Sequence, residues 1–402
     1  MARPLPRWAQ DASLGIFVHW GAYSVPAWAE PTGALGAVPD DEWFTHNAYA
    51  EWYANTIRID GSPAAVRHER VHGGAPYEEF LDEWRADEYD PAAWARLFAS
   101  LGADYVVPTT KHHDGIALWD APGSDRLSTV GRGPRRDLIG PLADAVRAEG
   151  LRFGVYYSGG LDWHFAEHPP ITASDQLSRF RPVDGAYNEY TFEHVADLVR
   201  RYRPDLVWND IDWPDAGKRP GPHSLEVLLG GYRAAVPDGI VNDRWGAPVG
   251  DYRTSEYEHD TGNETGAGWE QCRGLGFSFG YNQAEDDSLT LSPRELARLY
   301  ADTVSRGGRL LLNVGPTASG LIPDIQLRTL DGVAPWMREL KPHTIGRATI
   351  GSDTVEVRDR AGAPVWSRSW HAGERIVVVT EHAGLDIRAP RDAELVVLPL
   401  PE

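Results

Sequence analysis

Two acidic residues lie at the ends of short β-like runs, where they could act on a polar ligand. The stretch LVWNDIDWP (206–214) places Asp210 between two tryptophans, and the stretch TSEYE (254–258) contains Glu256. A pair of carboxyl groups can cleave a glycosidic bond when one acts as the nucleophile and the other as the acid and then the base. We therefore expect Asp210 and Glu256 to face each other at about 5–5.5 Å, the separation that retaining enzymes use.

Flat aromatic side chains that could line a sugar site are frequent: the 402 residues include 16 Trp, 16 Tyr and 10 Phe. An aromatic face stacks on the apolar C–H face of a pyranose and excludes water. A large core would use the same residues, so composition alone does not decide between the two interpretations. A carboxylate against indole rings, as at Asp210, is partly shielded from water, and this favours attack on a cationic sugar carbon.

Two other chemistries fit less well. His19, His112, His113 and Asp114 are candidate metal ligands, but the sequence has no H-x-H pair after the first apolar run, and these four residues do not form an H-E-x-x-H motif. Adjacent histidines that leave a strand tend to point apart, so we expect no metal site. A serine nucleophile would require G-x-S-x-G at a turn from a strand into a helix, and no such turn is predicted.

The elements expected to position these residues are short β-like runs, several of them continuously apolar, as in strands covered on both faces. Eight occur before residue 320, at 14–20, 104–110, 152–158, 205–210, 239–245, 252–257, 276–282 and 309–315. Helical patterns separate many of them, such as 90–102, which begins at Asp90-Pro91 and ends at Gly102, and 292–307, which opens with a capping box of Ser292 and Glu295.

This alternation predicts an α/β fold, an irregular (β/α)8 TIM-like barrel, with the irregularity where the fifth and sixth runs nearly abut. An open doubly wound sheet is the rival, but no G-x-G-x-x-G follows the first run. In such a barrel the active site lies at the carboxyl ends of the strands. Polar and aromatic side chains gather at those ends, which favours a catalytic mouth for a small polar ligand.

The residue pattern changes after about Pro342, where short runs rich in β-branched residues follow one another without helical patterns between them. We expect a barrel over residues 1–343 and a small antiparallel, β-sandwich-like domain over 344–402. The segments 22–88 and 164–189 fit neither pattern and are predicted to be loops with short helices at the barrel mouth.

Charge and composition restrict the partners and the location. The formal net charge is −20, which repels phosphate backbones and anionic lipid, so we expect no nucleic-acid or membrane partner. The chain has a single cysteine, Cys272, and neither an apolar leader nor a run of about 18 apolar residues, so we expect a cytoplasmic protein. Whether it is a monomer or a homo-oligomer stays open.

A set of motifs resembles one known family. The stretches LGIFVHWGAYSVPAWAE, TKHHDGIALWD, RFGVYYSGGLDW, LVWNDIDWP, VNDRWG, TSEYE and LLLNVGPTASGLIP occur in order between about residues 8 and 345. Together they resemble the α-L-fucosidases of glycoside hydrolase family 29, most closely the bacterial members with broad linkage tolerance. The resemblance implies a retaining exo-hydrolase that removes terminal α-L-fucose from an oligosaccharide or glycoside, without a metal or organic cofactor, and a barrel followed by a β-sandwich.

The resemblance also implies roles for individual residues. The family nucleophile falls on Asp210 and the acid/base of the most similar enzymes on Glu256. Fucose-binding groups carry over to His19, Glu51, Trp52, His112, His113, Tyr156, Trp208 and Arg244, and a recess for the C5 methyl group to Phe17, Ile211 and Phe279.

Alternatives remain at several points. Asp212 is a second candidate nucleophile, and Glu258, Asp260, Glu264 and Glu270 are rival acid/base candidates. The enzyme could instead act on another 6-deoxy or galacto-configured sugar, or the barrel could bind fucose without catalysis.

Overall fold

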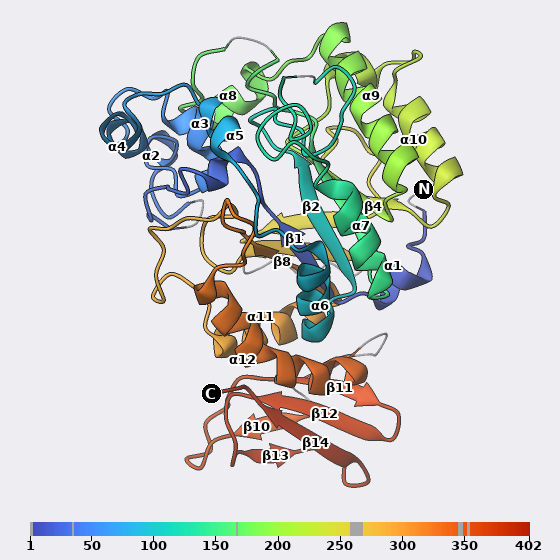
Figure 1. Ribbon diagram of the computed structural model, residues 1–402. Coiled ribbons are helices and arrows are strands. Elements are labelled where there is room, and N and C mark those ends of the chain that lie inside the picture. The colour runs from blue at the N-terminus through green and yellow to red at the C-terminus, as the bar shows by residue number, and fades with distance from the viewer. Residues whose placement is uncertain are drawn as a thin grey trace.

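A curled sheet of eight parallel strands forms the centre of the N-terminal part of the protein (Figure 1). The computed structural model describes residues 3–33, 36–124, 126–165, 168–257, 268–344, 349–351 and 354–402. The strands are β1 (Leu14–Val18), β2 (Tyr105–Lys111), β3 (Arg152–Ser158), β4 (Leu206–Asp210), β5 (Ile240–Val241), β6 (Arg253–Glu256), β7 (Trp269–Gly274) and β8 (Gly308–Val314). Their order, β5-β4-β3-β2-β1-β8-β7-β6, follows the chain around the sheet and leaves it open between β5 and β6. The predicted irregular (β/α)8 fold is confirmed, and the opening lies at the fifth and sixth strands.

The strands are apolar because helices and loops cover the sheet outside while side chains fill it inside. Every residue of β1, β2, β4 and β8 is buried. β1 pairs with β2 on one side and β8 on the other, for example Phe17 with Val107 and with Asn313. All eight strands are parallel, so their carboxyl ends meet at one edge.

The position predicted for the seventh strand, residues 276–282, is wrong. The structure places β7 at Trp269–Gly274, in register with β8 from Trp269–Gly308 to Gly274–Asn313, whereas 276–282 is a loop that follows it. Two glycines weaken 276–282 as a strand. The true strand, WEQCRG, was hidden by its polar residues, of which Glu270 is buried in an ion pair with Arg309.

Helices cover the outside of the sheet, and the predicted helix ends agree with the structure. Asp90 caps α6 by accepting a hydrogen bond from the Ala93 amide, and Gly102 ends it in the left-handed region. The Ser292–Glu295 capping box of α11 has both of its hydrogen bonds. The helices of eight or more residues are α4 (Pro63–His72), α6 (Pro91–Leu101), α7 (Ile139–Ala148), α9 (Gly185–Tyr202), α10 (Leu225–Ala235), α11 (Pro293–Ser305) and α12 (Asp324–Leu340).

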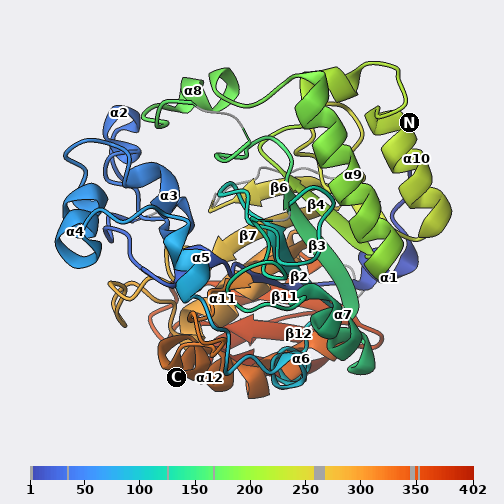
Figure 2. The same cartoon turned by 45° about the horizontal axis from the view of Figure 1, so that its top comes forward.

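The two long segments predicted to be loops carry short helices around the strand ends (Figure 2). They contain η1 (Ala22–Ser24), α2 (Asp40–Trp43), η2 (Ala50–Trp52), α3 (Tyr53–Thr56), α5 (Glu79–Glu83) and α8 (Ser174–Arg179), besides α4 and the start of α9. The remaining short helices are α1 (Arg7–Asp11), η3 (Asp215–Lys218) and η4 (Lys341–His343). A hydrogen bond from Ser174 to Asp40 joins the two segments.

The C-terminal part consists of two small sheets that pack below α11 and α12 (Figure 1). Their strands are β9 (Thr349–Ile350), β10 (Glu356–Arg358), β11 (Ser367–Ala372), β12 (Arg375–Thr380), β13 (Asp386–Arg388) and β14 (Glu394–Pro399). The predicted small β-domain is confirmed; its pairs are antiparallel except β12 with β14, which is parallel. Trp336 of α12 donates to the Pro399 carbonyl, and Arg294 and Arg298 of α11 pair with Glu381, so the part is fixed to the barrel. The boundary at 343/344 stays a prediction.

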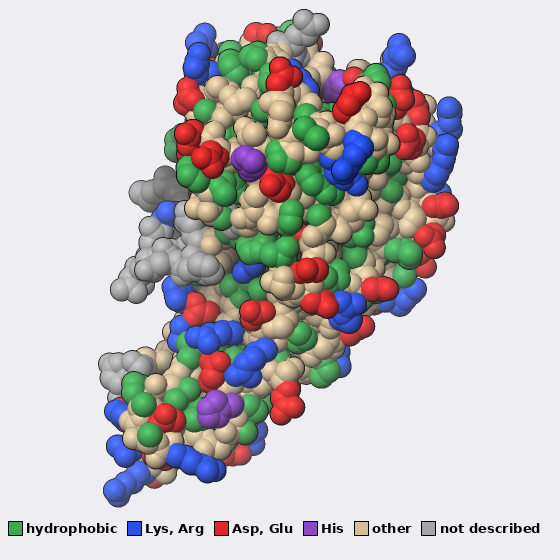
Figure 3. All heavy atoms as spheres, turned by 90° about the vertical axis from the view of Figure 1, so that its left-hand side faces the viewer, with side chains coloured by type: hydrophobic (Ala, Val, Ile, Leu, Met, Phe, Trp, Pro, Cys, Tyr) green, Lys and Arg blue, Asp and Glu red, His purple; other side chains and the backbone are tan. Residues whose placement is uncertain are grey.

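The surface carries charges of both signs. On the face shown in Figure 3, acidic and basic side chains are interspersed with apolar ones. Among the described residues, no helix has the length and apolar character that crossing a membrane requires.

Candidate active site

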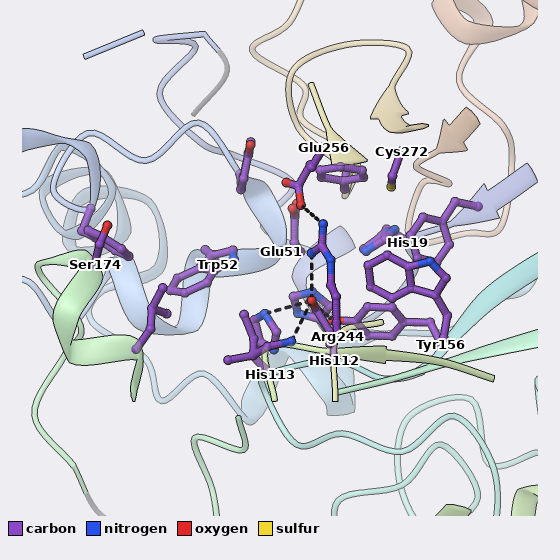
Figure 4. Close-up of a pocket in the computed structure, with 18 of the residues that line it drawn as sticks. His19, Glu51, Trp52, His112, His113, Tyr156, Ser174, Arg244, Glu256 and Cys272 are labelled. Carbon is purple, nitrogen blue, oxygen red and sulfur yellow. Dashed lines mark hydrogen bonds and ion pairs between the residues drawn. The ribbon is translucent and has the colours of Figure 1, made fainter. Parts of the chain in front are cut away.

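A cavity of about 230 Å³ opens at the carboxyl ends of the strands (Figure 4). All residues predicted for the site line it: Phe17, His19, Glu51, Trp52, His112, His113, Tyr156, Trp208, Asp210, Ile211, Arg244, Glu256 and Phe279. They come from strands β1, β3, β4 and β6, from the segments that follow β1, β2, β4, β5 and β7, and from the short helix η2. Parallel strands bring these distant residues together because all their carboxyl ends lie at one edge.

One guanidinium links the two candidate catalytic carboxylates. Arg244 donates from Nη1 to Asp210 Oδ1 at 3.1 Å and from Nη2 to Glu256 Oε2 at 3.0 Å. Thr254 Oγ1 accepts from Arg244 Nε at 3.1 Å, and the guanidinium carbon lies 4.7 Å from the centre of the Trp208 ring. The bridge limits the separation of the carboxyl groups to what one guanidinium spans, which includes the retaining value of about 5–5.5 Å.

The same surroundings shift the pKa values of Asp210 and Glu256 in opposite directions. Burial alone would raise the pKa of Asp210, but the charge of Arg244 and the Tyr156 hydroxyl, which donates at 2.8 Å, together lower that pKa below its ordinary value. Burial and the nearby charge of Asp210 raise the pKa of Glu256, although Arg244 opposes this. Two carboxyl groups with pKa values pushed apart suit an ionised nucleophile and a protonated acid.

The chain turns sharply directly after each of these carboxylates. Ile211 has φ 69° and Tyr257 has φ 53°, in the left-handed region that non-glycine residues rarely adopt. The Ile211 amide donates to Asp210 Oδ1, and the Tyr257 hydroxyl donates to the Phe277 carbonyl at 2.8 Å. Such conformations persist only where the surrounding contacts hold them, and here they set the direction in which the strand ends present Asp210 and Glu256.

Three histidines line the pocket in neutral form. Burial lowers the pKa of His19 to about 3 and that of His113 to about 4, and it also lowers that of His112. His19 Nδ1 lies 2.7 Å from Asn313 Oδ1, whose amide nitrogen donates to the Phe279 carbonyl, so His19 is the donor and its Nε2 is a free acceptor. The His112 ring stacks on the Tyr156 ring, with 5.5 Å between the ring centres. Neutral imidazoles of this kind can bind sugar hydroxyl groups.

Glu51 reaches the pocket from η2 and is held by the loop after β7. Its Oε2 accepts from the Gly280 amide at 2.7 Å and from the Ser278 hydroxyl at 3.3 Å. Burial raises its pKa to about 7, although these hydrogen bonds lower it. Glu51 can therefore accept from, or donate to, a ligand hydroxyl near neutral pH.

Aromatic and aliphatic side chains form the apolar part of the wall. Phe17 lies 5.1 Å from Trp208 and 4.6 Å from His19, and Phe279 lies 5.0 Å from His19, all measured between ring centres. With Ile211 these rings supply an apolar surface beside the polar groups, as a ligand with a methyl group requires.

Six further lining residues were missed from the sequence: Trp43, Phe44, Tyr49, Ser174, Leu177 and Cys272. Trp43 and Phe44 could have been noted as aromatic residues in an otherwise acidic part of the first long segment. Ser174 and Leu177 lie on α8 and Cys272 on the strand that was placed wrongly, so no local pattern marked them. Phe44 lies edge-on against Trp52 at 5.8 Å, on the side of the pocket toward α2 and α8.

Two rival carboxylates lie away from the pocket. Asp212 pairs with Lys218 at 2.7 Å and with Arg181 at 3.3 Å and is not among the lining residues. Glu270 points into the barrel, where it accepts from Trp208 Nε1 at 2.9 Å and pairs with Arg309 at 3.1 Å. Glu258, Asp260 and Glu264 lie outside the described residues.

Glu270 is expected to contribute to stability. Replacing it by glutamine leaves Arg309 buried without a counter-charge, which should lower the free energy of unfolding by about 3–5 kcal/mol in urea denaturation. The matched control is Glu394→Gln, which breaks a pair with Arg375 on the exposed surface and should cost less than about 1 kcal/mol. Equal losses in the two variants would contradict the role given to Glu270.

Other chemistries find little support in the site. The loop 276–280 has the spacing G-x-S-x-G, but the Ser278 hydroxyl donates to the Gly280 carbonyl and Glu51, and the segment is not a turn from a strand into a helix. Within the described residues, no group of three or more His, Cys, Asp or Glu side chains is arranged to hold a metal ion.

Comparisons with known proteins agree on one family. The family model for alpha-L-fucosidase matches residues 1–341. The tissue alpha-L-fucosidase of Mus musculus is 34% identical over 344 residues, which cover 84% of this chain and 70% of the mouse protein. The alpha-L-fucosidase of Dictyostelium discoideum is 33% identical over 347 residues, with 84% and 70% covered. The solved structure of the Thermotoga maritima alpha-fucosidase in complex with fucose has a TM-score of 0.82 and 43% identity, covering 93% of this chain and 82% of that one.

Proposed function

The chain belongs to the α-L-fucosidase family, and we propose that it removes terminal α-L-fucose from oligosaccharides or glycosides by double displacement, with Asp210 as nucleophile and Glu256 as acid/base. The observation that carries the assignment of roles is the Arg244 bridge between two carboxyl groups whose pKa values are shifted in opposite directions. A binding module without catalysis would have no need of this arrangement.

The first step forms an ester between the sugar and the enzyme. An oxygen of Asp210 bonds to the anomeric carbon while the bond to the glycosidic oxygen breaks, and that oxygen takes the proton of Glu256 and leaves as an alcohol. Tyr156 and Arg244 hold Asp210 for the attack. As the ester forms, the negative charge of Asp210 disappears.

The second step depends on that loss of charge. The charge of Asp210 raises the pKa of Glu256 in the free enzyme, so its disappearance lowers the pKa, while Arg244 still favours the ionised form. Glu256 can then accept a proton from water, whose oxygen bonds to the anomeric carbon as the ester bond breaks and its electron pair returns to Asp210. Fucose is released with its anomeric configuration retained.

Fucose would lie with its hydroxyl groups against the histidines, Glu51 and Arg244 and with its methyl group against Phe17, Ile211 and Phe279. Beyond the sugar, the wall toward α2 and α8 is formed by Phe44, Trp52 and Leu177, which favours an aglycone with an apolar face. The identity of 43–45% to the Thermotoga proteins, compared with 33–34% to the mammalian tissue enzymes, supports placement near the bacterial members. A cytoplasmic location stays a prediction.

Sugar selectivity tests this function. We expect release of 4-nitrophenol from 4-nitrophenyl α-L-fucoside, with kcat/KM about 10- to 100-fold above that for 4-nitrophenyl α-L-galactoside, which adds only a hydroxyl group on C6. The ratio is modest because an apolar recess rejects an added hydroxyl weakly. Equal or reversed turnover would support the alternative of a galacto-configured substrate, and fucose binding without release of product would support a binding protein.

The pH dependence of kcat/KM should be bell-shaped, because Asp210 must be ionised and Glu256 protonated. Activity should fall at low pH only below the ordinary range of an aspartate, since the pKa of Asp210 is lowered, and at high pH above the ordinary range of a glutamate, since that of Glu256 is raised. Glu51, with a pKa of about 7, could produce the same alkaline limb. With a fucoside whose leaving alcohol requires protonation, the limb should persist in Glu51→Gln and be absent from the residual activity of Glu256→Gln; the opposite pattern would assign it to Glu51.

A further inference from the structure

We propose that Ser158, held by the buried ion pair of Lys111 and Asp162, is a positioning residue that determines which ring nitrogen of His113 carries the proton. The inference rests on the proposed function, in which His113 lies beside the nucleophile: its Nε2 is 3.7 Å from Asp210 Oδ2. Lys111, Asp162 and Ser158 do not line the pocket, so they would act through His113.

The ion pair lies behind the pocket, closed off from solvent. The side chains of Lys111 and Asp162 are 0% and 2% exposed, and Nζ lies 2.9 Å from Oδ2. The ammonium group is 4.7 Å from the centre of the Tyr157 ring and about 6 Å from those of Tyr187 and Tyr190. Burying two charges costs free energy that their attraction often fails to recover, and apolar residues of similar volume would stabilise the fold as well. A function other than stability is therefore the better explanation of the pair.

The pair fixes the loop that follows β3. Lys111 Nζ donates to the Leu161 carbonyl at 3.4 Å as well as to Asp162. Asp162 Oδ1 accepts from the amides of His164 and Phe165, at 3.1 and 3.0 Å. The Leu161 carbonyl is thereby held where the Ser158 hydroxyl reaches it, at 2.7 Å.

The position of the proton on His113 follows from the donors and acceptors. A carbonyl only accepts, so the one hydroxyl hydrogen of Ser158 is used in its bond to Leu161. His113 Nδ1 lies 2.7 Å from Ser158 Oγ and must then be the donor, which leaves Nε2 without a proton. Burial, with Lys111 nearby, lowers the pKa of His113 to about 4, although Asp210 opposes the shift, so the ring is neutral near pH 7.

This tautomer serves the reaction in two ways. An unprotonated Nε2 accepts a hydrogen bond from a sugar hydroxyl placed between it and Asp210. A proton on Nε2 would instead face Asp210 Oδ2, 3.7 Å away, which already accepts from Tyr156, and its partial positive charge would weaken the nucleophile. The buried pair thus keeps a competing donor away from Asp210 without touching the substrate.

The tautomer of His113 can be measured directly by NMR. In protein labelled with ¹⁵N-histidine, with the His113 signals assigned from His113→Asn, we expect imidazole nitrogen shifts of the Nδ1–H form. Ser158→Ala should shift them toward the Nε2–H form and lower kcat/KM for the aryl fucoside about tenfold, as the loss of one buried hydrogen bond would. Ser158→Thr keeps the hydroxyl group and should preserve both properties.

Two further variants keep the outcome interpretable. Lys111→Met combined with Asp162→Asn removes the charges and should shift the tautomer in the same direction. Ser124→Ala is the matched control, because the buried Ser124 hydroxyl also donates to a carbonyl, that of Ala121, at a distance from His113. It should change neither the His113 nitrogen shifts nor kcat/KM. Unchanged His113 shifts in Ser158→Ala or in the double variant would overturn the inference, even if activity fell. A wild-type protein that does not cleave fucosides would refute the proposed function instead, while the shifts would still report the tautomer.

Discussion

Replacing Asp210 by alanine is expected to lower kcat for 4-nitrophenyl α-L-fucoside about 10⁴-fold, because no other group can form the ester with the anomeric carbon. The side chain is buried beneath the sugar site and accepts from Tyr156, Arg244 and the Ile211 amide. Its truncation leaves a small space on the face of the sugar from which the nucleophile attacks. Azide should enter this space, restore cleavage and give the β-fucosyl azide, detectable by NMR of the product.

Asp212→Ala is the matched control for this prediction. Asp212 is two residues away on the same turn, but it pairs with Lys218 and Arg181 outside the pocket. The control should keep kcat within about tenfold of the wild type, a loss small beside the effect at the nucleophile. The assignment of Asp210 fails if Asp212→Ala is the inactive variant, or if a 2-fluoro-fucoside inactivates the enzyme fully without labelling Asp210.

Replacing Glu256 by alanine is expected to have an effect that depends on the leaving group. A natural glycoside or another poor leaving group needs the proton of the acid, so its kcat/KM should fall by about 10²–10⁴-fold. An aryl fucoside with an acidic phenol needs little protonation and should retain much of its kcat/KM. Its kcat should still fall, because the ester intermediate then lacks a base to activate water.

Azide distinguishes this variant from that at Asp210. It should attack the ester intermediate from the face that water uses and give the α-fucosyl azide, the opposite anomer. Glu258, Asp260 and Glu264 were the other acid/base candidates, and alanine variants at these positions serve as the comparison. If one of them shows the dependence on the leaving group and the α-azide product while Glu256→Ala does not, the role of Glu256 belongs to that residue.

The sequence by itself determined the fold class and the polar residues at the strand ends that form the centre of the site. Apolar runs alternating with capped helices predicted the parallel barrel, because the caps at Asp90 and Ser292 and the buried strands are local properties of the chain. Once the strands are known to be parallel, the side chains at their carboxyl ends must meet. His19, Tyr156, Trp208, Asp210 and Glu256 were therefore expected at one edge, and all five line the pocket, whereas Glu51 and Trp52 came from the family resemblance.

The seventh strand marks a limit of that reasoning. Glu270 makes WEQCRG look unlike a buried strand, and only its partner Arg309 on the neighbouring strand makes the burial acceptable. A local pattern contains no information about a partner so distant in sequence. The same limit hid Leu177 and Ser174, which reach the pocket only because the two long segments fold over the same strand ends.

Only the tertiary structure decided what each carboxylate can do. Asp210 and Glu256 have similar surroundings in the sequence, each within two residues of an aromatic residue, but Arg244, Tyr156 and burial push their pKa values in opposite directions. Likewise the KHHDG motif marks Lys111 and His113 as neighbours, whereas the hydrogen bonds through Leu161 and Ser158 that connect them arise from folding. Electrostatic effects depend on distance and burial in space, so the roles follow from the fold while the residues follow from the sequence.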